Sequence, residues 1–356
     1  MKVGILTFHW ANNRNFGASL QSYACKELFN KILNTNNTEI INYNPTNFNI
    51  IKKGYHFLIG SSFSEYNNKF LKLTKEIKSI GELKELNNQF DIFVVGSDQV
   101  WRGIWFLENK EHYFFDFVNE DKKKIAYAAS FGVEYWEGTP KLTEKIKPLI
   151  KKFNHISVRE KSGIDICKNI FDVKAEWVLD PTLMLKKEDY QSILDEWTDK
   201  KHLKEKYIAY GLLKDDKNLQ NFCEKLSKKL NFQIKVIKGN TFNILGKNIT
   251  LFNKVSQWLT YLKDSEFVIT DSFHCTVFSL IFHKKFIVFP NKGGGVARLK
   301  SLLSMLGLEE RFIVDINSCN IEKIIDKEID YKEIDKRLKK EKEKSFDFLK
   351  KALGVN

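Results

Sequence analysis

Short apolar runs alternate with amphipathic stretches along most of the chain. The runs "KVGILTF", "FDIFVVGSDQVW" and "KKIAYAASFG" each end in polar residues, as buried strands do. Between the first two, Leu20, Tyr23, Ala24, Leu28 and Ile32 recur at helical spacing. "EIINYN", "HISVRE" and "AEWVLDPTL" predict further strands, and residues from about 45 to 75 are predicted to be a polar, aromatic connection.

The same alternation restarts after a charged stretch near residue 200. It predicts strands at "KYIAYGLL", "FQIKVIKG", "EFVITDS" and "KFIVFPN", with helices between and after them. Strands that alternate with helices indicate parallel sheets covered on both faces. We therefore predict an α/β protein with two Rossmann-like domains, 1–185 and 186–318, that face each other across a cleft. A Lys/Glu-rich helical tail, 319–356, follows.

The net charge and its distribution along the chain limit the classes of binding partner that we expect. Lys and Arg outnumber Asp and Glu by 58 to 45, a net charge of +13, but the lysines alternate with acidic residues in "KKHLKEK" and "KRLKKEKEK". That pattern is typical of solvated helix faces, and no zinc-finger, RNP or basic-zipper pattern occurs, so we do not expect nucleic acid as a partner. An anionic membrane surface or a phosphorylated small molecule remains.

Composition also indicates a soluble, cytoplasmic protein. Five scattered cysteines, without a CxxC pair, are typical of reduced thiols. No apolar run approaches the roughly 18 residues of a membrane span, and the first residues do not resemble a signal peptide. The sequence leaves open a homo-oligomer, and whether the basic tail touches the inner face of a membrane or packs back on the first domain.

Ligands of open parallel sheets bind beyond the carboxyl ends of the strands. In the first half this rule selects Arg14 and Asn15 at a helix start, and the loop "GSDQVWRG" with Ser97, Asp98, Gln99 and Trp101. Polar side chains beside one aromatic ring suit a sugar. The alternative is a turn in which Trp101 anchors the core.

The same rule selects Arg159 and Asp180, at the ends of two later strands. An arginine there suits a phosphate or carboxylate ligand. A salt bridge from Arg159 to Glu160 or Asp165 is the alternative.

In the second half, His274 lies just past a strand end, near a helix start, after Asp271 and Ser272. It is a candidate for chemistry, or it packs beside a polar helix cap made by one of those residues. In "NKGGGVARLK", Gly293 and Gly294 allow close backbone approach to an anion, and Lys292 and Arg298 supply charge. The alternative is a flexible turn. No metal-binding motif appears, and no metal is expected.

Seven stretches in order resemble the polysaccharide pyruvyl transferase family. They are "NFGASLQSYA", "FVVGSDQVWRG", "KIAYAASFG", "SVREKSG", "VLDPTLML", "VITDSFHCTVFSLIF" and "ARLKSLLSMLGLEER". The resemblance implies a GT-B-like fold and transfer of the enolpyruvyl unit of phosphoenolpyruvate to two hydroxyls of a sugar. It also implies that Arg159 and the segment Ser272-Phe273-His274 hold phosphoenolpyruvate. Some family members carry arginine at the position of Ser272, so one phosphate contact is either missing in this chain or supplied by Arg298, Lys292 or Arg14.

Combined, these observations give one hypothesis and two alternatives. A pyruvyl transferase would hold the donor phosphate with Arg159, Arg298 and the glycine-loop amides, and would protonate the donor with His274. Asp98 or Asp180 would deprotonate the acceptor hydroxyl or stabilise the cation, and the acceptor would be a free or lipid-linked saccharide. No cofactor is expected beyond phosphoenolpyruvate as co-substrate. The alternatives are a GT-B glycosyltransferase that uses a nucleotide-sugar, and a non-catalytic glycan- or anion-binding protein.

Overall fold

The computed structural model describes residues 1–9, 14–43, 61–103, 110–199, 205–213, 216–244, 247–291, 294–316 and 325–355. The chain divides into two compact units, which are described separately. Unit 1 consists of Met1–His56, Ser64–Leu185 and Arg337–Asn356, and unit 2 of Phe57–Phe63 and Lys186–Lys336.

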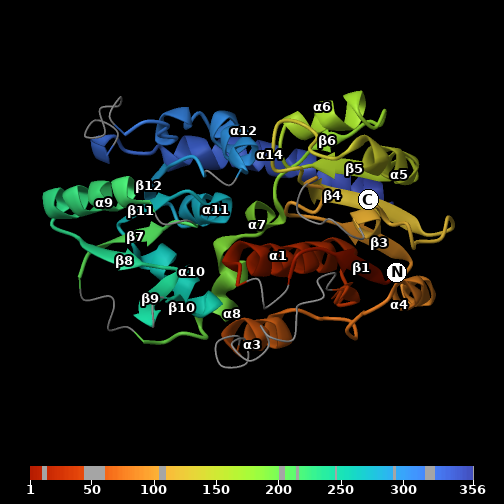
Figure 1. Ribbon diagram of the computed structural model, residues 1–356, viewed down its shortest axis with the longest axis horizontal. Helices are drawn as coiled ribbons and strands as arrows, with labels where there is room; N and C mark the ends of the chain where they lie inside the picture. Colours follow the sequence, from red (N-terminus) through yellow and green to blue (C-terminus); the bar gives the residue numbers. More distant parts are fainter. Residues whose placement is uncertain are drawn as a thin grey trace. The chain divides into compact units, whose positions relative to one another are not determined.

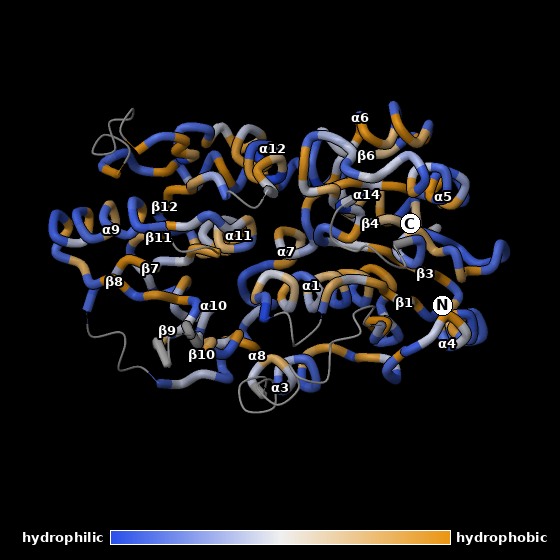
Figure 2. Tube along the Cα trace, viewed as in Figure 1, coloured by the Kyte–Doolittle hydropathy of each residue, from blue (hydrophilic) through white to orange (hydrophobic). Residues whose placement is uncertain are grey.

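Unit 1 is built on a six-stranded parallel sheet of order β2-β1-β3-β4-β5-β6 (Figure 1). Its strands are β1 (Val3–Leu6), β2 (Thr38–Ile40), β3 (Ile92–Val95), β4 (Lys123–Ala129), β5 (His155–Val158) and β6 (Glu176–Trp177). Every residue of β1 and β3 is buried, and both strands are hydrophobic along their length in Figure 2. This is the pattern of central parallel strands covered on both faces.

The helices that follow these strands are α1 (Phe16–Leu33), α3 (Ser61–Phe70), α4 (Ile80–Glu85), α5 (Pro140–Ile150), α6 (Ser162–Asn169) and α7 (Pro181–Met184). Helix α3 lies where we predicted only a connection, so that prediction is wrong for Ser61–Phe70. The first turns of α1 are buried on every side, including the polar residues Ser19, Gln21 and Ser22. A surface helix would expose such residues.

Unit 2 contains a four-stranded parallel sheet of order β12-β11-β7-β8. Its strands are β7 (Tyr207–Gly211), β8 (Gln233–Val236), β11 (Phe267–Thr270) and β12 (Lys285–Val288), and its helices are α8 (Gln191–Leu194), α9 (Lys217–Leu230), α10 (Val255–Asp264), α11 (Phe273–Ile281) and α12 (Val296–Leu306). An antiparallel hairpin of β9 (Gly239–Ile244) and β10 (Lys247–Phe252) was not predicted. Its mixed Asn, Thr and apolar residues do not show a clear strand period.

The C-terminal helix α14 (Tyr331–Leu353) begins in unit 2 and ends in unit 1. In unit 1 the Ser345 hydroxyl accepts a hydrogen bond from the backbone N–H of Leu179 at 3.0 Å, and the ring of Phe348 lies 6.4 Å from that of Tyr127. The end of the chain therefore packs on the first unit. No helix in the described part of the chain combines the length and the apolar character needed to span a bilayer.

Alanine at Gly96, which follows β3, should destabilise the protein. Gly96 has φ of 112°, and an added Cβ would lie 2.2 Å from the carbonyl oxygen of Tyr127. Because backbone must move, we expect a loss of about 2 kcal/mol or more in the free energy of unfolding. Gly81 of α4 is the matched control: its Cβ would meet only Ser79 Oγ, at 3.8 Å, so Gly81→Ala should be neutral or slightly stabilising. Equal denaturant midpoints for the two variants would contradict this reasoning.

Candidate functional site

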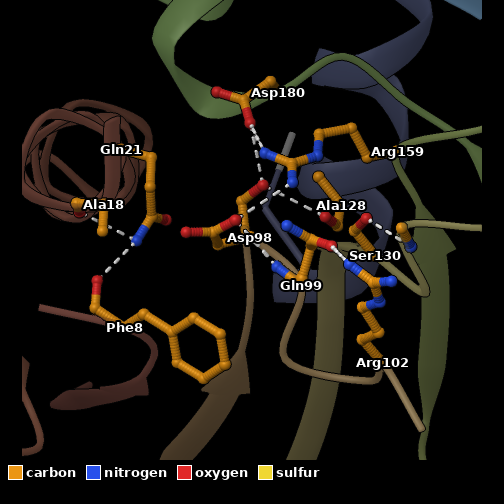
Figure 3. Close-up of polar contacts among 12 residues, drawn as sticks. Phe8, Ala18, Gln21, Asp98, Gln99, Arg102, Ala128, Ser130, Arg159 and Asp180 are labelled. Atoms are coloured by element: carbon orange, nitrogen blue, oxygen red, sulfur yellow. Dashed lines mark hydrogen bonds and ion pairs between the residues drawn. The ribbon is translucent and has the colours of Figure 1, made fainter. Parts of the chain in front are cut away.

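The parallel strands of unit 1 bring their carboxyl ends to one edge of the sheet. Ser97 and Asp98 follow β3, Arg159 follows β5 and Asp180 lies beyond β6. These residues, which the strand-end rule selected one by one, lie together: Ser97 and Arg159 donate to Asp180, and Arg159 also donates to Asp98. Figure 3 shows Arg159 between the two carboxylates.

Arg159 joins two carboxylates. Its Nη1 donates to Asp180 Oδ2 at 2.5 Å and its Nη2 to Asp98 Oδ1 at 3.3 Å, while 1 % of its side chain is exposed (Figure 3). Burial alone would lower the pKa of Arg159, but Asp180 and then Asp98 raise it above its usual value. The guanidinium stays charged and fixes both carboxylates.

These contacts differ from both sequence-based interpretations of Arg159. Its described salt bridges go to Asp98 and Asp180, and the charge of Glu160 also helps to raise the pKa of Arg159. The role of Arg159 as a phosphate ligand stays a prediction, and it requires that an incoming phosphate displace one carboxylate.

Asp180 is an anchor of the site. Besides Arg159, its carboxylate accepts from Ser97 Oγ at 2.9 Å and from the N–H and hydroxyl of Thr182 at 2.9 and 2.5 Å. Donors to both oxygens hold this carboxylate in one orientation. This geometry favours positioning over proton transfer.

Asp98 has a different environment. Its φ is 69°, a left-handed conformation that Asp tolerates better than most residues, and its Oδ1 accepts from the N–H of Gln99 at 2.9 Å as well as from Arg159. Strained backbone of this kind clusters at functional sites. Of the two carboxylates, Asp98 is therefore the better candidate for chemistry.

Two other residues that we predicted to bind the acceptor, Trp101 and Gln99, make contacts with neighbouring protein groups. Trp101 is 1 % exposed, is stacked on Phe114 with ring centroids 5.1 Å apart, and donates to the carbonyl of Tyr113. A sugar platform needs an open ring face, so this prediction is wrong and the core-anchor interpretation is right. Gln99 Oε1 accepts from Arg102 Nη1 at 3.1 Å.

At the start of α1, Asn15 is the N-cap. Its side chain accepts from the backbone N–H of Ala18 at 3.1 Å. Arg14, just before it, has φ of 46°, and burial lowers its pKa. Both residues lie at the amino end of the helix, as predicted.

Sequence reasoning missed the structural role of Glu160. Its Oε1 accepts from the backbone N–H groups of Phe131 and Gly132 at 2.7 and 3.0 Å, which fixes the loop after β4. A buried glutamate at a strand end, next to an arginine, was the available signal.

In unit 2, the residues after β11 form a polar helix start, as one interpretation predicted. Ser272 is the N-cap of α11 and accepts from the N–H of Cys275 at 3.5 Å. Asp271 Oδ1 accepts from the N–H of Leu213 at 2.7 Å. His274 lies in the first turn of α11, buried, with its ring edge-on to Phe273 at 5.2 Å.

Arg298 joins this cluster from α12. Its guanidinium carbon lies 5.4 Å from the centroid of the Phe273 ring. An added Cβ on Gly295 (φ 92°) would lie 2.2 Å from Arg298 Nη2, so the arginine rests against a glycine backbone. Gly294 also has positive φ, and Gly295 is the N-cap of α12, so no side chain caps this helix. Lys292 and Gly293 lie outside the described residues.

The structure thus brings Ser97, Asp98, Arg159 and Asp180 together in unit 1, and Phe273, His274 and Arg298 in unit 2. In the described ranges, no group of three or more His, Cys, Asp or Glu side chains has the arrangement of a metal site.

The two parallel sheets define an α/β protein of Rossmann-like units with a GT-B-like fold, as predicted. A putative UDP-N-acetylglucosamine 2-epimerase from Listeria monocytogenes is similar, with TM-score 0.53, 10 % identity and coverage of 96 % of this chain and 90 % of that one. S. aureus MnaA, solved with UDP, has TM-score 0.54 and 10 % identity, with coverage of 100 % and 98 %. At such identity these likenesses concern the fold. The predicted cleft between the domains stays a prediction.

The family model of the polysaccharide pyruvyl transferases matches residues 15–293. The chain belongs to this family, and it is therefore a transferase, as its motifs predicted. A comparison with curated proteins gave no significant match.

Replacing Asp180 by Asn should destabilise the protein, because the buried Arg159 then loses its ion pair with Asp180. The substitution keeps the shape but removes the charge that faces the buried guanidinium, and we expect a loss of roughly 3–5 kcal/mol in the free energy of unfolding. Asp172, whose carboxylate contacts Lys151 on the surface at 2.9 Å, is the control: Asp172→Asn should leave the midpoint of urea unfolding unchanged. Similar midpoints for Asp180→Asn and wild type would show that the buried pair contributes little.

Proposed function

We propose that this chain transfers the enolpyruvyl unit of phosphoenolpyruvate to two hydroxyls of one sugar residue, in a polysaccharide or its lipid-linked precursor. The products are a cyclic pyruvate ketal and inorganic phosphate. The observation that carries the proposal is the fixed carboxylate of Asp98, held by Arg159 at the ligand-binding edge of its sheet. Family membership supports the reaction class.

The reaction needs one acid and at least one base. A proton adds to C3 of the donor, which leaves cationic character at C2. One sugar hydroxyl forms a bond to C2, the C2–O bond to phosphate breaks, and the second hydroxyl closes the ketal. The two hydroxyl protons balance the proton gained at C3 and the one carried away by the phosphate.

Residues of unit 2 suit the donor. Arg298 supplies a guanidinium, which recognises phosphate or carboxylate in a bidentate way, and the uncapped amino end of α12 supplies backbone N–H groups. His274, linked to Arg298 through the Phe273 ring, is our candidate acid for C3, because histidine exchanges a proton near neutral pH. This scheme requires neither metal nor organic cofactor.

Residues of unit 1 suit the acceptor. Asp98 is our candidate base for the first hydroxyl. Arg159 and Gln99 fix its position through contacts with Oδ1, and Asp180 holds Arg159 in turn. A base held in one orientation loses no binding energy to reorganisation during the reaction.

Activity can be tested by incubating the protein with phosphoenolpyruvate and a panel of saccharides. We expect release of inorganic phosphate that depends on the saccharide, and a product whose mass has grown by one pyruvic acid less one water. His274→Ala should lower kcat by about two to four orders of magnitude, because general acid catalysis is lost. His283, half-exposed just after α11, is the matched control; it has φ of 54°, which Asn tolerates, so His283→Asn should keep wild-type kcat.

Calorimetry separates this proposal from its alternatives. Phosphoenolpyruvate should bind the wild type and lose affinity for Arg298→Ala. Transfer of a sugar from a nucleotide-sugar, without use of phosphoenolpyruvate, would favour a glycosyltransferase. Saccharide binding without turnover of any donor, unchanged in His274→Ala, would favour a non-catalytic protein.

A further inference from the structure

A buried glutamine on α1 has its amide fixed in one orientation. Gln21 is 0 % exposed, and its Nε2 lies 3.0 Å from the carbonyl oxygen of Phe8 and 3.1 Å from that of Ala18. Carbonyl oxygens accept hydrogen bonds only, so the NH2 group must face them. The amide cannot be flipped without placing oxygen against oxygen.

Two hydroxyls near the same NH2 group reinforce this orientation. Thr7 Oγ1 and Ser22 Oγ lie 2.9 and 3.0 Å from Nε2. Thr7 donates its own proton to the carbonyl of Ser97, and Ser22 donates to a carbonyl as well, so both hydroxyls accept from the amide. Gln21 therefore also connects β1 to the backbone that precedes Asp98.

The other end of the amide has no such partner. Gln21 Oε1 is buried and accepts no hydrogen bond from any described residue. In Figure 3 this oxygen and the carboxylate of Asp98 point toward one another. A buried acceptor left unsatisfied costs about 1–3 kcal/mol, and two facing acceptors cannot satisfy each other. A donor to Gln21 Oε1 must therefore come from a group other than Asp98 and the described residues.

We propose that Gln21 Oε1 and Asp98 form a subsite that binds two hydroxyls of the same acceptor sugar. This inference rests on the proposed function, because a cyclic ketal closes only where one sugar residue offers two hydroxyls. The hydroxyl that donates to Asp98 loses its proton first and bonds to C2 of the donor. The hydroxyl that donates to Gln21 keeps its proton until ring closure, since a neutral amide positions a hydroxyl without deprotonating it.

Substrate analogues test the subsite without altering the protein. The probes are the saccharide that accepts pyruvate in the screen above and its two monodeoxy forms, each lacking one of the two hydroxyls. Calorimetry should show about 3- to 10-fold weaker binding of each monodeoxy form to the wild type, the range for a lost hydrogen bond. In Gln21→Met the side chain has a similar length and no amide. This variant should bind the parent saccharide about 3- to 10-fold more weakly than the wild type does. Its affinity should no longer change when one of the two hydroxyls is removed.

Ser22→Ala is the matched control, because it removes a contact on the nitrogen side of the amide and leaves Oε1 in place. This variant should still discriminate between the saccharide and both monodeoxy forms. Binding of the saccharide to Gln21→Met at wild-type affinity, or equal binding of all three probes to the wild type, would overturn the subsite.

A crystal structure of the ligand-free wild type separates failure of the subsite from failure of the proposed function. We expect an ordered water between Gln21 Oε1 and the Asp98 carboxylate, in the place of the hydroxyls. Such a water would support a subsite that binds hydrogen-bond donors such as hydroxyls, even if no saccharide accepts pyruvate. A protein group that donates to Gln21 Oε1 would overturn the inference even if pyruvyl transfer is observed.

Discussion

The structure of unit 1 depends on one buried cation. Arg159 lies just after β5, the strand beside the edge strand β6, almost completely inaccessible, between carboxylates from the loops after β3 and β6. A guanidinium in such a place is tolerated only with its charge compensated. Because the two carboxylates come from loops on either side of β5, one interaction fixes both loops.

The two carboxylates that compensate the charge of Arg159 have different contacts, and this difference separates the roles of Asp180 and Asp98. Asp180 also receives donors from Ser97 and Thr182, and is bound on both oxygens. Asp98 shares one oxygen between Arg159 and Gln99, and its carboxylate points toward Gln21. An anchor and a reactive group can thus arise from two residues of the same type that differ in their hydrogen-bond partners and in their backbone conformation.

The sequence allowed much of the fold to be predicted, because buried parallel strands such as "KVGILTF" and "FDIFVV" are apolar on both faces. The strand-end rule then located Asp98, Arg159 and Asp180. It did not predict which acids Arg159 would contact: Asp98 is 61 residues away, and only the order of the strands makes the two neighbours. Gln21 was missed for a related reason, since a polar residue on a helix is expected at the surface. Trp101 was misassigned because a loop position alone does not tell whether an indole packs inward.

Helix α14 reverses the usual order of folding during synthesis. Domains nearest the N-terminus generally fold first as the chain leaves the ribosome. Here Ser345 and Phe348 complete unit 1 beside Leu179 and Tyr127, yet they are synthesised after the whole of unit 2. All of unit 2 has been made when the chain reaches Lys336, so it can fold while unit 1 still lacks the part of α14 that packs on it. The backbone just before Asp180 therefore gains its contact with Ser345 only after unit 2 has been synthesised.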